Sequence, residues 1–174
     1  MTAANNLLAA AIETRLFHED SQSDEALFRR LFPEGSEFSP CMKRRLVKLG
    51  IDPSKKPSDL TSIERSAFAR LDFDKESITW QRVLDVCDRH LRRVQVGLGC
   101  NEIIVDKSSQ KVQHSRLTGF DITVASEVMA VLALAKDLKD LREKLGSMVV
   151  GYSKNGAPIT ADDLGCGKGL IVGI

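Results

Sequence analysis

Short apolar runs alternate with segments of helical period from residue 80 onward, and this alternation most constrains the fold. Apolar residues at helical spacing predict one helix over Trp80–Arg93, capped by Thr79, and a long one over Ser126–Leu145. Three apolar runs predict strands: Val94–Leu98, Phe120–Val124 and Met148–Tyr152. Strands that alternate with helices favour an α/β layer with a partly parallel sheet.

The segment Gly99–Gly119 is polar apart from Ile103–Val105, which predicts a hairpin or a mobile loop. Further on, Thr160 and Asp163 have the spacing of a capping box and predict a short helix. The apolar residues Leu170–Ile174 predict a last strand.

The first 75 residues predict helices. Apolar spacing and alanine content predict a helix over Ala3–His18. The stretch Ser21–Lys75 is separate in character and predicts three short helices. Their expected ends are marked by familiar cap residues: Ser39 with Pro40, then Gly50, then Thr61 with Glu64.

The second of these short helices has a basic face, formed by Lys43, Arg44, Arg45 and Lys48. Such a face suits a polyanion, but a solvated surface is the more frequent explanation, because acidic residues elsewhere balance the charge. We therefore expect the four cations to face water.

The composition is that of an ordinary globular domain. A chain of 174 residues with 43% hydrophobic residues and a net charge of +1 predicts one domain and no nucleic-acid partner. Its apolar runs are far shorter than the roughly 20 residues of a membrane span, and no targeting segment is evident, so we expect a cytoplasmic protein without membrane contact.

Neither cysteine nor histidine spacing predicts a metal site. No two cysteines have the two-residue spacing typical of zinc, and the three histidines lie in different segments. We expect all four cysteines to be reduced packing residues: Cys41, Cys87, Cys100 and Cys166. The glycine-rich segment Gly165–Gly169 lacks the Ser or Thr that follows the lysine of a phosphate loop, which favours a simple turn.

The junction between the predicted strand at Phe120 and the helix opening at Ser126 is the best candidate site. Ligands of open α/β sheets bind outside the carboxyl ends of strands, where free helix N–H groups favour anions. A purely structural role is the alternative, in which Ser126 caps the helix and Glu127 complements its dipole.

Three stretches resemble formate–tetrahydrofolate ligase, also called formyltetrahydrofolate synthetase. They are TAANNLLAAAIETRLFHE from Thr2, ITWQRVLDVCDR from Ile78, and the long stretch from Phe120 to Gly165 that contains VASEVMAVLAL and PITADDLG. The likeness is closest to the eukaryotic form, as found in the trifunctional one-carbon tetrahydrofolate synthase. It departs at Val86 and Cys87, where the family has Thr and Asn.

The resemblance implies an α/β fold: residues 1–174 as a single partial domain of P-loop type, mostly helical by residue count, with 21–75 as a helical insert. It implies an ATP-dependent reaction, in which MgATP phosphorylates formate and tetrahydrofolate then takes the formyl group to give 10-formyltetrahydrofolate. The family's phosphate loop precedes the segment that matches Thr2. We therefore expect an internal fragment that is inactive alone and holds none of these substrates or a metal by itself.

The resemblance also implies the site residues and the wider setting. Those expected to line or support the formyl phosphate and folate site are Thr118, Asp121, Thr123, Ser126, Glu127 and, more weakly, Asn5. The parent enzyme is expected to be a cytoplasmic homo-oligomer, with a mitochondrial parent as the alternative. The rival hypothesis is a non-catalytic short form that acts as an interaction or oligomer-interface module.

Overall fold

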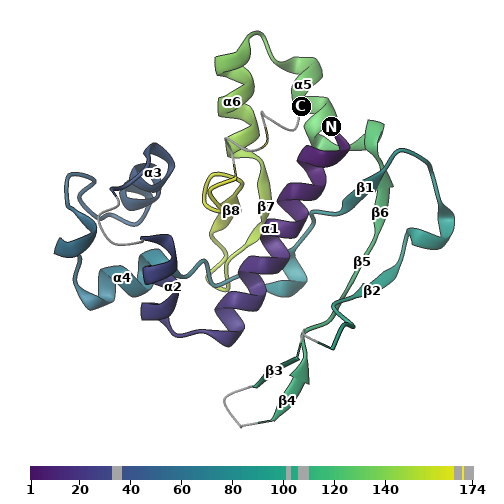
Figure 1. Ribbon diagram of the computed structural model, residues 1–174. Coiled ribbons are helices and arrows are strands. Elements are labelled where there is room, and N and C mark those ends of the chain that lie inside the picture. The colour runs from purple at the N-terminus through teal and green to yellow at the C-terminus, as the bar shows by residue number, and fades with distance from the viewer. Residues whose placement is uncertain (33–36, 101–102, 106–109, 167–169, 171–174) are drawn as a thin grey trace.

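The computed structural model describes residues 1–32, 37–100, 103–105, 110–166 and 170. Its longest element, helix α1 (Thr2–Ser21), runs through the middle of the molecule (Figure 1). Three short helices and the strands between residues 149 and 160 lie on one side of it, and the strands between residues 82 and 122 lie on the other. The helix predicted over Ala3–His18 is confirmed. Its buried face includes Leu8 and Ile12, both 0% exposed.

Helices α2 (Asp24–Leu31), α3 (Pro40–Lys48) and α4 (Ser62–Ala69) confirm the three short helices. The expected caps are in place. The Ser39 hydroxyl accepts a hydrogen bond from the amide of Met42, Thr61 and Glu64 form a capping box, and Gly50 follows α3 with φ +71°. Local capping interactions therefore mark these helix ends.

The described strands form four separate two-stranded sheets. Strands β1 (Arg82–Leu84) and β6 (Phe120–Ile122) are parallel, whereas the other three pairs are antiparallel. These other pairs are β2 (Val94–Val96) with β5 (Arg116–Thr118), β3 (Ile103–Val105) with β4 (Lys111–Gln113), and β7 (Val149–Tyr152) with β8 (Pro158–Thr160). The mixed α and β composition is confirmed, but the described strands do not assemble into one layered sheet.

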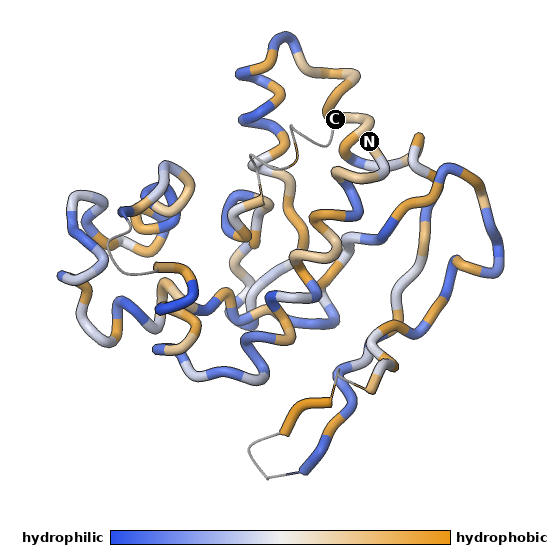
Figure 2. Tube along the Cα trace, viewed as in Figure 1, coloured by the Kyte–Doolittle hydropathy of each residue, from blue (hydrophilic) through white to orange (hydrophobic). Residues whose placement is uncertain are grey.

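Strands β2 to β5 make a narrow arm that leads away from the body (Figure 1). The hairpin expected within Gly99–Gly119 is confirmed by the pairing of β3 with β4. Figure 2 shows apolar residues along β3 at the far end of this arm, and Val105 is 60% exposed.

Two expected helices differ from the structure. The helix over Trp80–Arg93 is wrong: strand β1 lies there, followed by a single 3₁₀ turn, η3 (Arg89–Leu91). The helix expected over Ser126–Leu145 is two helices, α5 (Glu127–Leu134) and α6 (Leu138–Ser147). They separate where the Asp137 side chain accepts a hydrogen bond from the amide of Asp140 at 2.8 Å and caps α6.

The end of the chain is described in part. Thr160 and Asp163 make the predicted reciprocal contacts, but turns rather than a helix follow them. Apart from the buried Leu170, the strand expected at Leu170–Ile174 lies outside the described residues, as does most of the segment Gly165–Gly169. The described chain also contains the 3₁₀ turns η1 (Pro57–Asp59) and η2 (Lys75–Ser77).

Among the residues that the structure describes, buried apolar side chains form two separate cores. The main core joins α1, α6 and the β7–β8 pair, and its fully buried members include Leu8, Leu145 and Val150. The second core belongs to α2–α4, a unit that we call the helical module (residues 24–69). Four phenylalanines contact one another there, with ring centroids 4.8–6.4 Å apart: Phe28, Phe32, Phe38 and Phe68.

Candidate functional site

The parallel pair β1–β6 brings two polar residues to one edge of its sheet. Because the strands run in the same direction, with Leu84 opposite Ile122, their carboxyl ends meet. Asp85 follows β1, and Thr123 follows β6 as the first residue of the 3₁₀ turn η4 (Thr123–Ala125). This edge is where ligands bind in open α/β sheets.

The start of α1 lies against β1 and fixes its position. The side-chain amide of Asn6 donates to the carbonyl of Val83 at 3.0 Å and accepts from its amide at 2.8 Å, as a neighbouring strand would. Asn5 donates to the carbonyl of Gln81 at 2.9 Å, while its own carbonyl accepts from the indole of Trp80 at 3.2 Å. The predicted candidate Asn5 is therefore buried and holds α1 against β1.

Three oxygen atoms meet beside this contact. The hydroxyls of Thr123 and Thr2 both lie within hydrogen-bond distance of the Asp85 carboxylate, the first at 2.8 Å, and they lie 2.9 Å from each other. The two hydroxyls have one proton each, so at most two of these three contacts are hydrogen bonds at once. Hydrogen bonds from Thr2 and Thr123 lower the pKa of Asp85, which keeps this exposed side chain ionised.

The bend between Thr123 and the helix α5 has a buried and an open side. Thr123 and Ser126 are 8% and 7% exposed, whereas Val124 is 70% exposed. The Ser126 hydroxyl accepts a hydrogen bond from the amide of Met129 at 3.3 Å and caps α5. Partial burial raises the pKa of Glu127 in the first turn of the helix. The bend is thus not sealed inside the main core, because Val124 and Glu127 are exposed, but its two hydroxyl side chains are buried.

The remaining predicted candidates are more scattered. Asp121 lies on β6 with its side chain exposed, opposite Val83 of β1. Thr118 is half-buried on β5, paired with Val94, beyond the amino end of β6 and therefore away from the edge that Thr123 occupies. The structure places Thr123, Ser126 and Glu127 together at the bend after the carboxyl end of β6, Asn5 beside Gln81 at the amino end of β1, and Thr118 apart on β5.

Sequence reasoning missed Thr2 and Asp85. Asp85 lies inside the segment for which a helix was predicted, so its place after a strand was hidden. A weak signal was present, because Asp85 directly follows the apolar residues Val83 and Leu84, as a polar residue at a strand end does. Thr2 could be found only from the tertiary contact.

The described part of the chain gathers no three His, Cys, Asp or Glu side chains that could hold a metal ion. The same residues contain no helix both long and apolar enough to cross a bilayer. None of the four cysteines, all of which lie among the described residues, is part of a disulfide. Cys41 is buried as expected, but Cys87 and Cys100 are exposed, so for these two the prediction of a packing role is wrong.

Comparison with known proteins gives consistent matches over the whole chain. It is 57% identical to the formate–tetrahydrofolate ligase of Spinacia oleracea, over 99% of this chain and 26% of the relative. It is 53% identical to the cytoplasmic C-1-tetrahydrofolate synthase of Schizosaccharomyces pombe, over 99% of this chain and 18% of that protein. It is 52% identical to the human mitochondrial monofunctional C1-tetrahydrofolate synthase, over 99% and 17%.

The chain therefore spans about a quarter of the length of its plant relatives and less than a fifth of the synthases. The family model for formate–tetrahydrofolate ligase matches residues 1–174, which is the full length of this chain. With this match and the identities above, the chain belongs to the formate–tetrahydrofolate ligase family.

Proposed function

We propose that this chain forms part of the reaction site of an ATP-dependent ligase that makes 10-formyltetrahydrofolate from formate and tetrahydrofolate through formyl phosphate. The observation that carries the proposal is the meeting of Asp85, Thr2 and Thr123 at the carboxyl edge of β1 and β6, beside the exposed bend into α5. The activity belongs to the whole ligase, of which this chain covers a part.

The chemistry of the second step suits the groups at this edge. The amine nitrogen of tetrahydrofolate attacks the formyl carbon, phosphate leaves, and the amine loses a proton. An ionised Asp85 is suited to accept hydrogen bonds from N–H groups of the substrate. Glu127, whose pKa is raised by partial burial, is suited to take or hold a proton. The N–H groups that open α5 favour the phosphate.

Further features of the family belong to the same proposal. We propose that the chain is a piece of a P-loop-type domain, and that Thr118, Asp121, Thr123, Ser126, Glu127 and Asn5 line or support its formyl phosphate and folate site. Magnesium would arrive with ATP, whose phosphates commonly complete its coordination. The described residues do not offer a metal donor set of their own, so we route no step through the ion. The parent is a cytoplasmic homo-oligomer in this proposal.

The test replaces matching residues in the full-length spinach ligase. The change that corresponds to Asp85→Asn keeps the shape of the side chain and removes its charge. We expect formate- and tetrahydrofolate-dependent release of ADP to fall by about 10²-fold or more. The matched control is Asp52→Asn: Asp52 is also an exposed aspartate whose pKa is lowered by hydrogen bonds, from Ser54, but it lies in the helical module. Full activity of the Asp85 variant would refute the proposal.

The isolated chain is tested in the same assay. We expect no turnover from the 174-residue polypeptide, because the family's phosphate loop lies outside the stretch it matches. Turnover at the rate of the full-length ligase would show that the chain is catalytically sufficient and would overturn the expectation of an inactive piece.

A second candidate function is favoured by exposed apolar side chains around α5 and α6. Leu134 and Leu138 are 72% and 76% exposed, and Val124 is 70% exposed. Clusters of this kind mark surfaces that associate with other proteins. Sedimentation velocity distinguishes the two: a clean monomer at micromolar concentration counts against an interaction module.

A further inference from the structure

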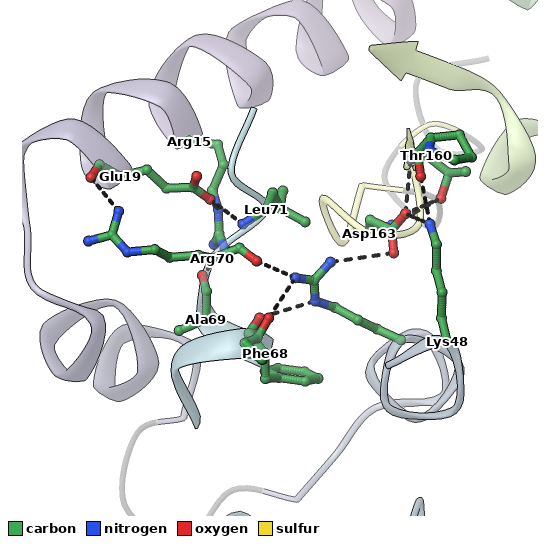
Figure 3. Close-up of polar contacts among 12 residues, drawn as sticks. Arg15, Glu19, Lys48, Phe68, Ala69, Arg70, Leu71, Thr160 and Asp163 are labelled. Carbon is green, nitrogen blue, oxygen red and sulfur yellow. Dashed lines mark hydrogen bonds and ion pairs between the residues drawn. The ribbon is translucent and has the colours of Figure 1, made fainter. Parts of the chain in front are cut away.

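A polar seam joins the helical module to the rest of the molecule (Figure 3). Among the described residues, the two hydrophobic cores share no member. Charged side chains instead cross between them. From the body, Arg15 donates to the carbonyl of Ala69 at the end of α4. From the module, Arg44 and Lys48 of α3 reach Asp162 and Asp163. Lys43, Arg44 and Lys48 of the basic face are exposed as expected, although the last two also contact these aspartates. The expectation of a solvated face is wrong for Arg45, whose side chain is 11% exposed. Part of the basic face of α3 is therefore a docking surface.

Arg45 is the most buried cation of this seam, with a side chain that is 11% exposed. It leaves α3 and donates to the carbonyl of Phe68 at 3.1 Å and to that of Arg70 at 2.6 Å, while its guanidinium lies 5.6 Å from the centre of the Phe68 ring. Its remaining nitrogen faces the Asp163 carboxylate at 3.6 Å. One guanidinium thus connects α3, the end of α4 and the turn after β8.

Asp163 receives this contact together with three others. Lys48 donates to it at 2.8 Å, and the amide and hydroxyl of Thr160 each donate at 2.9 Å. Burial alone would raise the pKa of Asp163, but the bonds from Lys48 and Thr160 outweigh it and the pKa is lowered. The carboxylate therefore stays ionised and is held equally by its own turn and by α3.

The turn continues beyond Asp163 through backbone bonds to Cys166. The amide of Gly165 donates to the carbonyl of Asp162 at 3.0 Å, and that of Cys166 to the carbonyl of Ala161 at 3.1 Å. Cys166 is half-buried, and burial raises the pKa of its thiol. Its reactivity consequently reports whether this turn is closed.

We propose that the helical module positions the turn 160–166 through Arg45, Lys48 and Asp163, so that docking of the module and closure of the turn are one coupled equilibrium. The physical reason is the burial of the charges. When one partner of a buried ion pair is removed, the remaining charge is left uncompensated, and it regains solvation only if the seam opens. Coupling of this kind is reciprocal: a change in the turn must loosen the module as much as a change in the module loosens the turn.

The competing account is that the turn closes through the capping box of Thr160 and Asp163 alone. Both of these residues lie within the turn, so in that case no substitution in α3 would alter its closure. The two accounts therefore differ in what happens to Cys166 when only the module is changed.

The experiment measures labelling rates of individual cysteines in the intact chain by a maleimide, with each site resolved by mass spectrometry. The exposed Cys87 and Cys100 give reference labelling rates for exposed cysteines. In Arg45→Met we expect Cys166 to react at least about tenfold faster than in the unaltered chain, relative to these references, since a tenfold change corresponds to about 1.4 kcal/mol of closure.

The matched control is Arg65→Met. Arg65 also lies over a phenylalanine ring, at 5.5 Å from the centre of Phe28, and donates to a carbonyl, that of Ser58 at 2.9 Å, but these partners lie within the module. We expect it to leave the rate of Cys166 within about threefold. Equal acceleration by both arginine variants would mean general loosening of the module and would overturn the specific role of Arg45.

The second part of the experiment tests the reciprocal effect of the turn on the module. Asp163→Asn changes only the turn, and we expect it to accelerate labelling of the buried Cys41 in α3. If Arg45→Met unfolds the module, as judged by circular dichroism, Lys48→Met decides the matter, because Lys48 is a partly exposed partner of the same carboxylate. An unchanged rate of Cys166 in Lys48→Met, or of Cys41 in Asp163→Asn, would refute the coupling.

Discussion

Glu19 offers the sharpest test of how the polar seam stabilises the protein. Its carboxylate is 6% exposed and accepts hydrogen bonds from Arg15 at 2.8 Å, from the amide of Leu71 at 2.7 Å and from the amide of Asp72 at 3.0 Å. Asp72 has φ +50°, a conformation uncommon for a residue with a side chain. The carboxylate therefore holds the chain in a tight change of direction as it leaves the helical module.

Glu19→Ala removes all three acceptor contacts at once. Each buried N–H left without a partner costs about 1–3 kcal/mol, and an arginine that loses its buried partner brings the expected total to about 3–5 kcal/mol. This is a large part of the roughly 5–15 kcal/mol by which a domain is stable. Glu19→Gln keeps one acceptor oxygen and should cost less.

Urea unfolding followed by circular dichroism and by the fluorescence of Trp80, the single tryptophan, measures the loss. Glu25→Ala is the control, because Glu25 is exposed in the first turn of α2, where a charge is worth about 0.3–1 kcal/mol. A loss below about 1 kcal/mol for Glu19→Ala would refute the reasoning, because water would then be replacing the carboxylate at little cost.

Two further outcomes follow from local geometry. The pKa of Glu64 is lowered to about 2 by hydrogen bonds from Lys55 and the Thr61 amide; the stability it contributes should be complete above about pH 4.5 and lost as the pH falls toward 2. Acid titration of the unfolding midpoint, compared with Glu64→Gln, checks this: a difference between the two proteins that does not shrink as the pH falls from 4.5 to 2 would contradict it. Gly97→Ala should destabilise far more than Gly156→Ala. Both glycines have positive φ, but only at Gly97 would a Cβ atom meet a backbone carbonyl, at 2.1 Å, and equal melting temperatures of the two variants would contradict the prediction.

The helices of the first half could be predicted because their signals are local. Ser39, Thr61 and Glu64 bond to backbone groups within three residues, so their role is written in a short window of sequence. The break at Asp137 is equally local, since its side chain caps α6 at Asp140. The continuous apolar spacing from Ser126 onward concealed it.

The segment after residue 80 could not be predicted in the same way. Trp80 and Val83 do lie three residues apart on a buried side, which is the pattern of a helix. Their burial comes instead from α1 and from β6, whose strand lies almost 40 residues further along the chain. Tertiary pairing overrides local periodicity here, because Asn6 takes the place of a neighbouring strand beside Val83.

Only the part of the candidate site that follows β6 could be predicted from the sequence. Thr123, Ser126 and Glu127 follow from the change between strand and helix, a feature of consecutive residues. Thr2 and Asp85 reach Thr123 across 121 and 38 residues of sequence, and such contacts depend on the parallel register of β1 and β6. Asp85 was missed because it was assigned to a helix, and Thr2 because only the tertiary contact brings it to the site.

The chain enters and leaves the helical module at a single point. Arg70, at the exit, donates to the carbonyls of Glu19 and Gln22, at the entrance, at 2.7 and 2.9 Å. The helical module has its own core, and hydrogen bonds hold its two ends together. Such a segment can vary in length, or be replaced by a short connection, without opening a cavity in the main core. Evolution can therefore add or remodel such a unit as an appendage, and a protein engineer can graft it, provided that the aspartates it docks against are also accommodated.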